Sequence, residues 1–223
     1  MGRDEASSAS WSSYDRSFRE DAHQLLVWGY YDSRRRITSE SEETEITGFI
    51  VEAMEARLSA PDIDERFDRY CVKEDNPAPG EGRTGKRRRR MDVIVESSHR
   101  PRHKRRPKFV FEAKRLRRPG HLIGDYVGDD GVKRFVYARY AADCPEMAMV
   151  GFVQSDDAMY WIGRLEEQFD NDTTDEFRVR EVLAKKSVIS DLPDEWGSRH
   201  LRTNGTPIAI YHILLDCTSA AAA

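Results

Sequence analysis

Met91-Asp92-Val93-Ile94-Val95-Glu96 and Lys108-Phe109-Val110-Phe111-Glu112-Ala113-Lys114-Arg115 are the two stretches that decide the fold of this chain. Both are short and apolar, which predicts two β-strands. The period of two in a strand places Glu112 and Lys114 on one face, with side chains roughly 7 Å apart. If Asp92 lies beside Glu112 on a neighbouring strand, two carboxylates and an ammonium converge. Two carboxylates that bind a metal ion and a nearby ammonium group are the smallest set of side chains that metal-assisted hydrolysis of a phosphodiester needs.

The charge of the chain is distributed unevenly. Residues 83–118 contain 16 Lys and Arg and three acids, a net charge of +13, so the total of −4 leaves −17 for the rest. Two of these acids are Asp92 and Glu112. Cations around a few carboxylates are expected where a polyanion and a metal ion bind together, because Lys and Arg neutralise phosphates while acids hold the ion. The cations form clusters at 86–90 and 100–108, and we expect a hairpin to bring both clusters to the same end of the sheet.

Hydrophobic periodicity outlines the remaining elements. It predicts helices over 14–31, 39–58, 132–142 and 156–169, and strands over 66–74, 91–96, 108–115, 147–153 and 207–215. The wholly apolar run 147–153 is typical of a central strand buried on both faces. The polar residues 1–13 are expected to be disordered, and the uniform alanines of 220–223 are set aside as a tail. The sequence therefore predicts one domain over 14–219, of the α/β class, with a central mixed β-sheet flanked by helices.

The composition argues against several classes of protein. No run approaches the roughly 20 apolar residues that a membrane span needs, and the N-terminus is polar, so a cytoplasmic location is expected. The three cysteines are far apart, which argues against a disulfide framework or a zinc site. A glycine-rich phosphate loop followed by Lys-Ser or Lys-Thr is absent from the sequence, which argues against a nucleotide-hydrolysing motor.

The acids and the order of elements together resemble the PD-(D/E)XK nuclease superfamily, whose fold is restriction-endonuclease-like. The resemblance covers about 39–155, with Asp92 as the acid of the second core strand and Glu112-Ala113-Lys114 as the (D/E)-x-K triplet. Met91 stands where the motif has proline. The resemblance implies a metal-dependent nuclease acting on nucleic acid, DNA favoured over RNA. It also allows a homodimer, or a subunit of a larger complex that supplies target recognition, as in phage-defence or mobile-element systems.

The resemblance further implies a glutamate from the preceding helix, and helical geometry ranks the candidates. Glu43 lies one turn before Ile46 on the apolar face, so it is our first choice. Glu42, near the same face, and Glu45, on its flank, remain open. Each of these acids could instead be a surface carboxylate that favours the helix N-terminus electrostatically.

Roles for the site residues follow from the resemblance. Asp92, Glu112, Glu43 and the carbonyl of Ala113 would hold one or two Mg²⁺ or Mn²⁺ ions through oxygen ligands. Lys114 would orient or deprotonate the attacking water, or stabilise the pentavalent phosphorane as a point charge.

Phosphates of the nucleic acid are expected to contact the two basic clusters and one later helix. The predicted contacts are Arg87, Arg88, Arg89, Arg90, Lys104, Arg105 and Arg134. Arg134 could equally be an ion-pairing residue. Two alternatives to an enzyme remain: a catalytically silent nucleic-acid-binding module with the same fold, and an interaction protein whose basic residues 83–106 bind acidic partners or RNA.

Overall fold

The structure, a computed structural model, describes all residues except 1–2, 78–89, 99–105, 140, 193 and 219–223. Its helices are α1 (Arg3–Ser33), α2 (Glu43–Leu58), α3 (Ile123–Val127), α4 (Val132–Val136) and α5 (Ala158–Asp170), with short 3-10 helices η1 (Arg34–Arg36) and η2 (Glu65–Phe67). Its strands are β1 (Tyr70–Pro77), β2 (Arg90–Ser97), β3 (Lys108–Leu116), β4 (Glu146–Val153), β5 (Val179–Lys185), β6 (Glu195–Leu201) and β7 (Pro207–Asp216).

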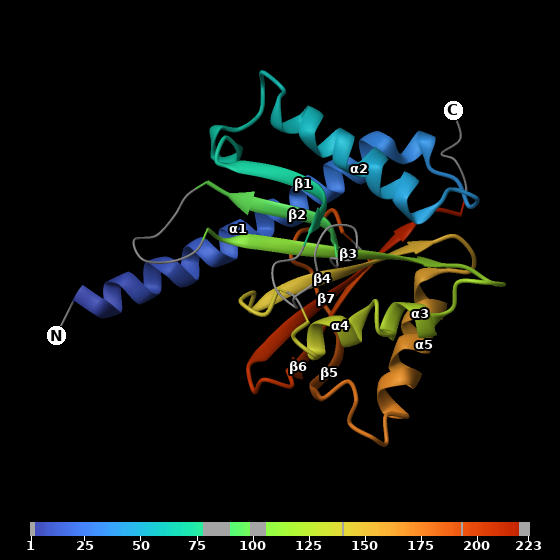
Figure 1. Ribbon diagram of the computed structural model, residues 1–223. Coiled ribbons are helices and arrows are strands. Elements are labelled where there is room, and N and C mark those ends of the chain that lie inside the picture. The colour runs from blue at the N-terminus through green and yellow to red at the C-terminus, as the bar shows by residue number, and fades with distance from the viewer. Residues whose placement is uncertain (1–2, 78–89, 99–105, 140, 193, 219–223) are drawn as a thin grey trace.

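The described strands form one mixed seven-stranded sheet in the order β1-β2-β3-β4-β7-β6-β5 (Figure 1). β3, β4 and β7 are parallel to one another, and the pairs on either side of them are antiparallel. β4 lies between two parallel neighbours and is buried on both faces, as its apolar run predicted. The predicted α/β class with a central mixed sheet and flanking helices is therefore confirmed.

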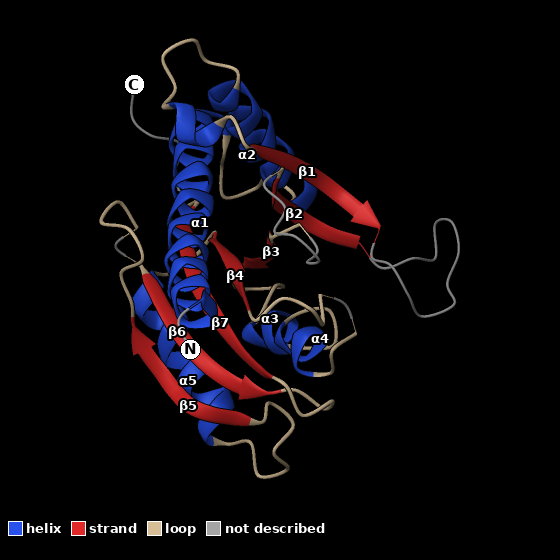
Figure 2. Cartoon of the chain, turned by 90° about the vertical axis from the view of Figure 1, so that its left-hand side faces the viewer, coloured by secondary structure: helices blue, strands red, loops and turns tan. Residues whose placement is uncertain are grey.

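Helices cover both faces of the sheet, and each face has its own apolar core. α1 and α2 pack on one face (Figure 2), and the core there includes Leu25, Ile50 and Phe111. α3, α4 and α5 pack on the other face, and the core there includes Phe135, Trp161 and Met149. The sheet therefore separates two layers, and residues that project from opposite faces of β3 belong to different cores.

Several element boundaries differ from the sequence prediction. α1 begins at Arg3 rather than at residue 14, because no proline or glycine interrupts residues 3–28. α2 begins at Glu43 rather than at residue 39, after a capping box between Glu42 and Glu45. β1 begins only at Tyr70, because η2 occupies the preceding residues.

The second half of the chain holds the larger differences. The helix expected over 132–142 is limited to the five residues of α4, since Ala138 and Ala141 have positive φ angles of 51°. Helix α3 and strands β5 and β6 were not predicted. Among the described residues, no helix combines the length and apolar content needed to cross a bilayer.

Candidate active site

The two predicted acid-bearing strands pair with each other. β2 and β3 are antiparallel, with Val93 opposite Phe111, so the same register places Asp92 opposite Glu112. Opposite residues of an antiparallel pair share a face of the sheet. Asp92 Oδ2 also accepts a hydrogen bond of 2.8 Å from the backbone N–H of Ala113. The fold thus brings together the two acids that the sequence singled out.

The ammonium group of Lys114 lies among these acids. Its Nζ is 3.0 Å from Oε1 of Glu43 and 3.5 Å from Oε1 of Glu112, and it donates a hydrogen bond of 2.7 Å to the carbonyl of Ala113. Lys114 and Glu112 come from β3, whereas Glu43 comes from the first turn of α2. The ammonium therefore contacts three of the oxygen groups predicted as metal ligands.

Of the three candidate helix acids, Glu43 is the one that reaches Lys114. Its Oε2 also accepts a hydrogen bond of 3.2 Å from the backbone N–H of Arg115. Glu42 instead forms an ion pair with the Arg115 guanidinium, and Glu45 accepts from the backbone N–H of Glu42 at 3.3 Å. The helical phase thus identified the acid that lies closest to the triplet.

Two buried side chains hold the start of α2 against β3, and the sequence analysis missed their role. Nε of Arg115 donates to Oε1 of Gln154 at 2.9 Å, and Nε2 of Gln154 donates to the carbonyl of Ser41 at 2.7 Å. Because each of these groups has its partner, the segment before Glu43 is fixed in position. The only sequence cue for Gln154 is its place directly after the apolar run 147–153.

Arg134 of α4 approaches the site from the layer opposite α2. Its Nη1 donates to Oε1 of Glu112 at 2.6 Å, and its Nη2 donates to Oδ1 of Asp130 at 2.5 Å. The Arg134 side chain is buried and forms ion pairs with Glu112 and Asp130. Ion pairing was the alternative to a phosphate contact for this residue. The turn before α4 depends on Gly131, because a Cβ there would lie 1.9 Å from the carbonyl oxygen of Tyr126.

The charges of the site shift the pKa values of Lys114 and Asp92. Burial alone would lower the pKa of Lys114, but the carboxylates of Glu112, Glu43 and Asp92 together raise it above its ordinary value. Burial raises the pKa of Asp92, against the opposing effects of Lys114 and the Ala113 N–H. Lys114 is therefore a firmly protonated cation, suited to stabilise negative charge rather than to take a proton from water.

The donor chemistry of the site fits a divalent cation. Asp92, Glu112 and Glu43 offer carboxylate oxygens and Ala113 offers a carbonyl, the ligands that Mg²⁺ prefers. Within the described part of the chain, however, no group of three His, Cys, Asp or Glu residues is arranged to hold a metal ion. Among the described residues, Lys114 pairs with Glu43 and Glu112, and Arg134 pairs with Glu112.

Most of the predicted phosphate contacts lie outside the residues that the structure describes. Arg87, Arg88, Arg89, Lys104 and Arg105 lie outside the described residues; Arg90 begins β2, but its side chain is not described either.

The expectation that both basic clusters lie at one end of the sheet concerns residues 86–90 and 100–108, most of which lie outside the described residues. Asp92 is two residues from the start of β2.

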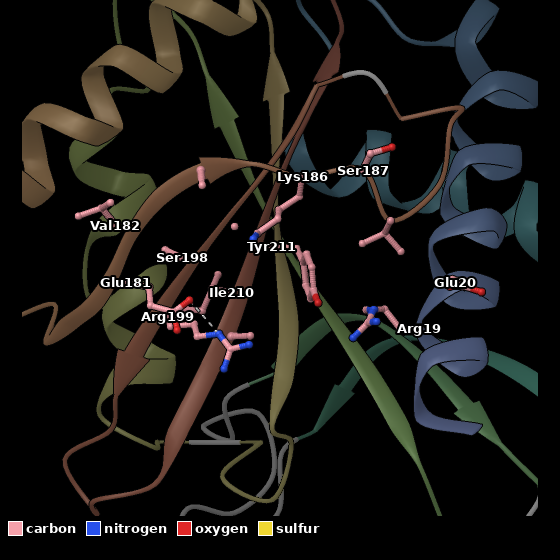
Figure 3. A pocket seen from close by; sticks show the side chains of 14 residues that line it. Arg19, Glu20, Glu181, Val182, Lys186, Ser187, Ser198, Arg199, Ile210 and Tyr211 are labelled. Carbon is pink, nitrogen blue, oxygen red and sulfur yellow. Dashed lines mark ion pairs between the residues drawn. The ribbon is translucent and has the colours of Figure 1, made fainter. Parts of the chain in front are cut away.

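A cavity of about 380 Å³ lies away from these acids, between α1 and the strands β5, β6 and β7 (Figure 3). Its polar side chains include Arg19, Lys186 and Tyr211. Nη1 of Arg19 is bound to Glu146 at 2.7 Å, and Arg199 is paired with Glu181 at 3.1 Å. None of the predicted site residues that the structure describes lines this cavity, so convergence of charged groups, rather than cavity size, identifies the candidate active site.

No protein-family model, curated protein or solved structure matches this chain.

Proposed function

We propose that this chain is a metal-dependent nuclease of the PD-(D/E)XK type, which hydrolyses phosphodiester bonds in nucleic acid, with DNA as the favoured substrate. One observation carries the proposal. Glu43 and Glu112 pair with the ammonium of Lys114, and Asp92 lies opposite Glu112, where its charge acts on the same ammonium. Ion pairs that only stabilise a fold rarely place two carboxylates opposite each other on a covered face of a sheet, because burying carboxylates costs free energy.

The side chains have distinct roles in this proposal. Asp92, Glu112 and Glu43 would hold Mg²⁺ or Mn²⁺, which when bound polarises the scissile phosphate. Lys114, protonated and fixed by its neighbours, donates to a non-bridging phosphate oxygen and stabilises the charge that develops there. The Arg115–Gln154 contact keeps Glu43 in place. The basic residues of 83–118 supply the attraction for a polyanion.

Because these roles involve no contact with bases, we expect little intrinsic sequence preference. Cutting both strands of a duplex takes two such sites, so a homodimer or a larger complex is part of the proposal.

The test is cleavage by the purified full chain. Supercoiled DNA, linear duplex DNA, single-stranded DNA and single-stranded RNA are incubated with Mg²⁺, with Mn²⁺ or with EDTA. We expect cleavage that needs the metal and that falls by about 10²–10³-fold in Lys114→Met, the usual effect of losing one transition-state donor. Glu112→Gln should be inactive as well. Glu96→Gln is the matched control, because Glu96 lies further along β2 and pairs with Lys73 instead.

Two outcomes contradict the proposal. If the folded wild-type chain cuts none of the four substrates with either metal ion, the chain is not a nuclease on its own. If it binds DNA without cutting, and Glu112→Gln binds equally well, the silent nucleic-acid-binding module is the better description. Melting curves of each variant show whether lost activity reflects a lost fold.

A further inference from the structure

The carboxylate of Glu112 is bound by two cations from different elements. Nη1 of Arg134 is 2.6 Å from Oε1, and Nζ of Lys114 is 3.5 Å from the same oxygen. The Glu112 side chain is only 1% exposed. A divalent ion that took Glu112 as a ligand would therefore be repelled by the charges of Arg134 and Lys114. This repulsion would be strong, because water screens charges only weakly at a buried position.

Arg134 and Lys114 differ in the position of their other acidic partner. Nη2 of Arg134 is 2.5 Å from Asp130, whose side chain is 72% exposed. Lys114 contacts Glu43 as its second acid, and this contact lies within the site. Arg134 therefore reaches from a buried acid to an acid at the surface. It can leave Glu112 and still keep an ionic partner, so it is the cation that a metal ion can displace.

We propose that Arg134 is an exchangeable counter-ion. It neutralises Glu112 while no divalent ion is bound; when Glu112 takes the ion, Arg134 turns outward with Asp130 and contacts a phosphate of the nucleic acid. The guanidinium suits both roles, because its planar fork binds carboxylates and phosphates through paired hydrogen bonds. The inference rests on the proposed function, and it adds a residue that couples metal binding to substrate binding.

Metal affinity and cleavage should respond to Arg134→Met in opposite directions. This variant keeps a long side chain and removes its charge. We expect calorimetric titration of the full chain with Mn²⁺ to show tighter binding, within about the 5- to 150-fold range of coupled sites, because a competitor for Glu112 is gone. At saturating Mn²⁺, DNA cleavage should fall by about 10²–10³-fold. A purely structural arginine would lower both quantities.

Two further variants make the test specific. Arg139→Met removes a nearby arginine that pairs with Asp129, and it should leave Mn²⁺ affinity unchanged. Asp130→Asn removes the outer partner of Arg134, so the guanidinium is left with Glu112 and Mn²⁺ binding should weaken. Because Asp130 is exposed, this variant tests the inference even if Arg134→Met does not fold.

A folded Arg134→Met chain whose Mn²⁺ affinity equals or falls below that of the wild type overturns the inference. In a Glu112→Gln background, Arg134→Met should have no effect on affinity, because the shared acid is gone. The titration needs no nucleic acid. Tighter binding without any wild-type cleavage therefore contradicts the nuclease proposal alone, and wild-type cleavage without tighter binding contradicts this inference alone.

Discussion

At the scale of single residues, Asp92 shows that the site is unfavourable for stability. Its pKa is raised because burial disfavours the charged carboxylate more than Lys114 and the Ala113 N–H favour it. The unfolded chain therefore loses this proton at a lower pH than the folded chain. The group favours folding below its ordinary pKa of 3.8, and this contribution is lost as the pH rises through the raised value. At neutral pH, the charge of Asp92 opposes folding.

Asp92→Asn should consequently stabilise the protein at pH 7. An amide oxygen can still accept from the Ala113 N–H, while the buried charge is removed. We expect a gain of about 0.5–2 kcal/mol in the free energy of unfolding in urea, with activity abolished, as is common when a functional site is relieved of strain. The gain should shrink as the pH approaches 3.8. Glu55→Gln, on the exposed face of α2, should change neither quantity; a less stable Asp92→Asn at pH 7 would contradict this account.

At the scale of elements, the position of Glu43 depends on how closely α2 packs on α1. Gly29 of α1 makes this contact: a Cβ there would lie 2.7 Å from the carbonyl oxygen of Ile50 and 2.6 Å from Cγ of Met54. Because the Ile50 oxygen belongs to the backbone, helix α2 would have to move to make room for this Cβ. The other helical glycine to compare is Gly163 of α5, where a Cβ would meet nothing within 4 Å.

These two glycines give opposite predictions for the same substitution. Gly29→Ala should lower the free energy of unfolding by about 1–3 kcal/mol, because it overpacks the α1–α2 contact. Gly163→Ala should raise it by about 0.4–1 kcal/mol, because the new methyl group meets no obstacle and the unfolded chain loses entropy. Urea unfolding of both variants measures the difference. Equal effects of the two substitutions would show that the helices do not approach as closely as described.

At the scale of the whole molecule, a buried chain of hydrogen bonds crosses the layer of α3 and the outer strands. A carbonyl only accepts, so Nδ1 of His200 donates to Phe177 at 2.7 Å, and its Nε2 accepts from Ser198 at 2.7 Å. Nε2 of His212 lies 2.8 Å from the Ser198 hydroxyl, and its Nδ1 lies 3.1 Å from the Tyr126 hydroxyl, which also donates to the carbonyl of Met149 at 3.3 Å. Burial lowers the pKa of His200 to about 4 and that of His212 to about 3.

Stability should therefore fall in mild acid. In the unfolded chain, these histidines bind protons below their ordinary pKa of 6.5. In the folded chain, they stay neutral down to their lowered pKa values of about 4 and about 3. Protonation therefore stabilises the unfolded state relative to the folded state as the pH drops from 6.5 towards 4. Each histidine contributes up to about 1.4 kcal/mol per pH unit. His200→Asn should reduce this slope, and His121→Asn, outside the network, should not. Urea unfolding at pH 7, 6, 5 and 4.5 gives the slopes, and equal slopes for the two variants would contradict the assignment.

The same scale shows which features the sequence could predict. β3 and β4 were found because their burial produces apolar runs, and Glu43 was selected because helical phase fixes its direction. β5 lacks such a signal: it is an exposed edge strand, formed through its pairing with β6. The contact between Arg134 and Glu112 could not be predicted from the sequence either. It depends on the turn at Gly131, and hydrophobic periodicity does not predict such a turn.

The meeting of two layers at β3 has a consequence for the newly made protein. Glu43 reaches Lys114 from the layer of α1 and α2, which contains one apolar core. Arg134 reaches Glu112 from the layer of α3, α4 and α5, which contains the other core. A chain that has formed only one of these cores holds only part of the charge set. Under the proposed function, hydrolysis would then need both layers to be packed on β3, so a partly folded chain would carry these acids without being able to cut nucleic acid.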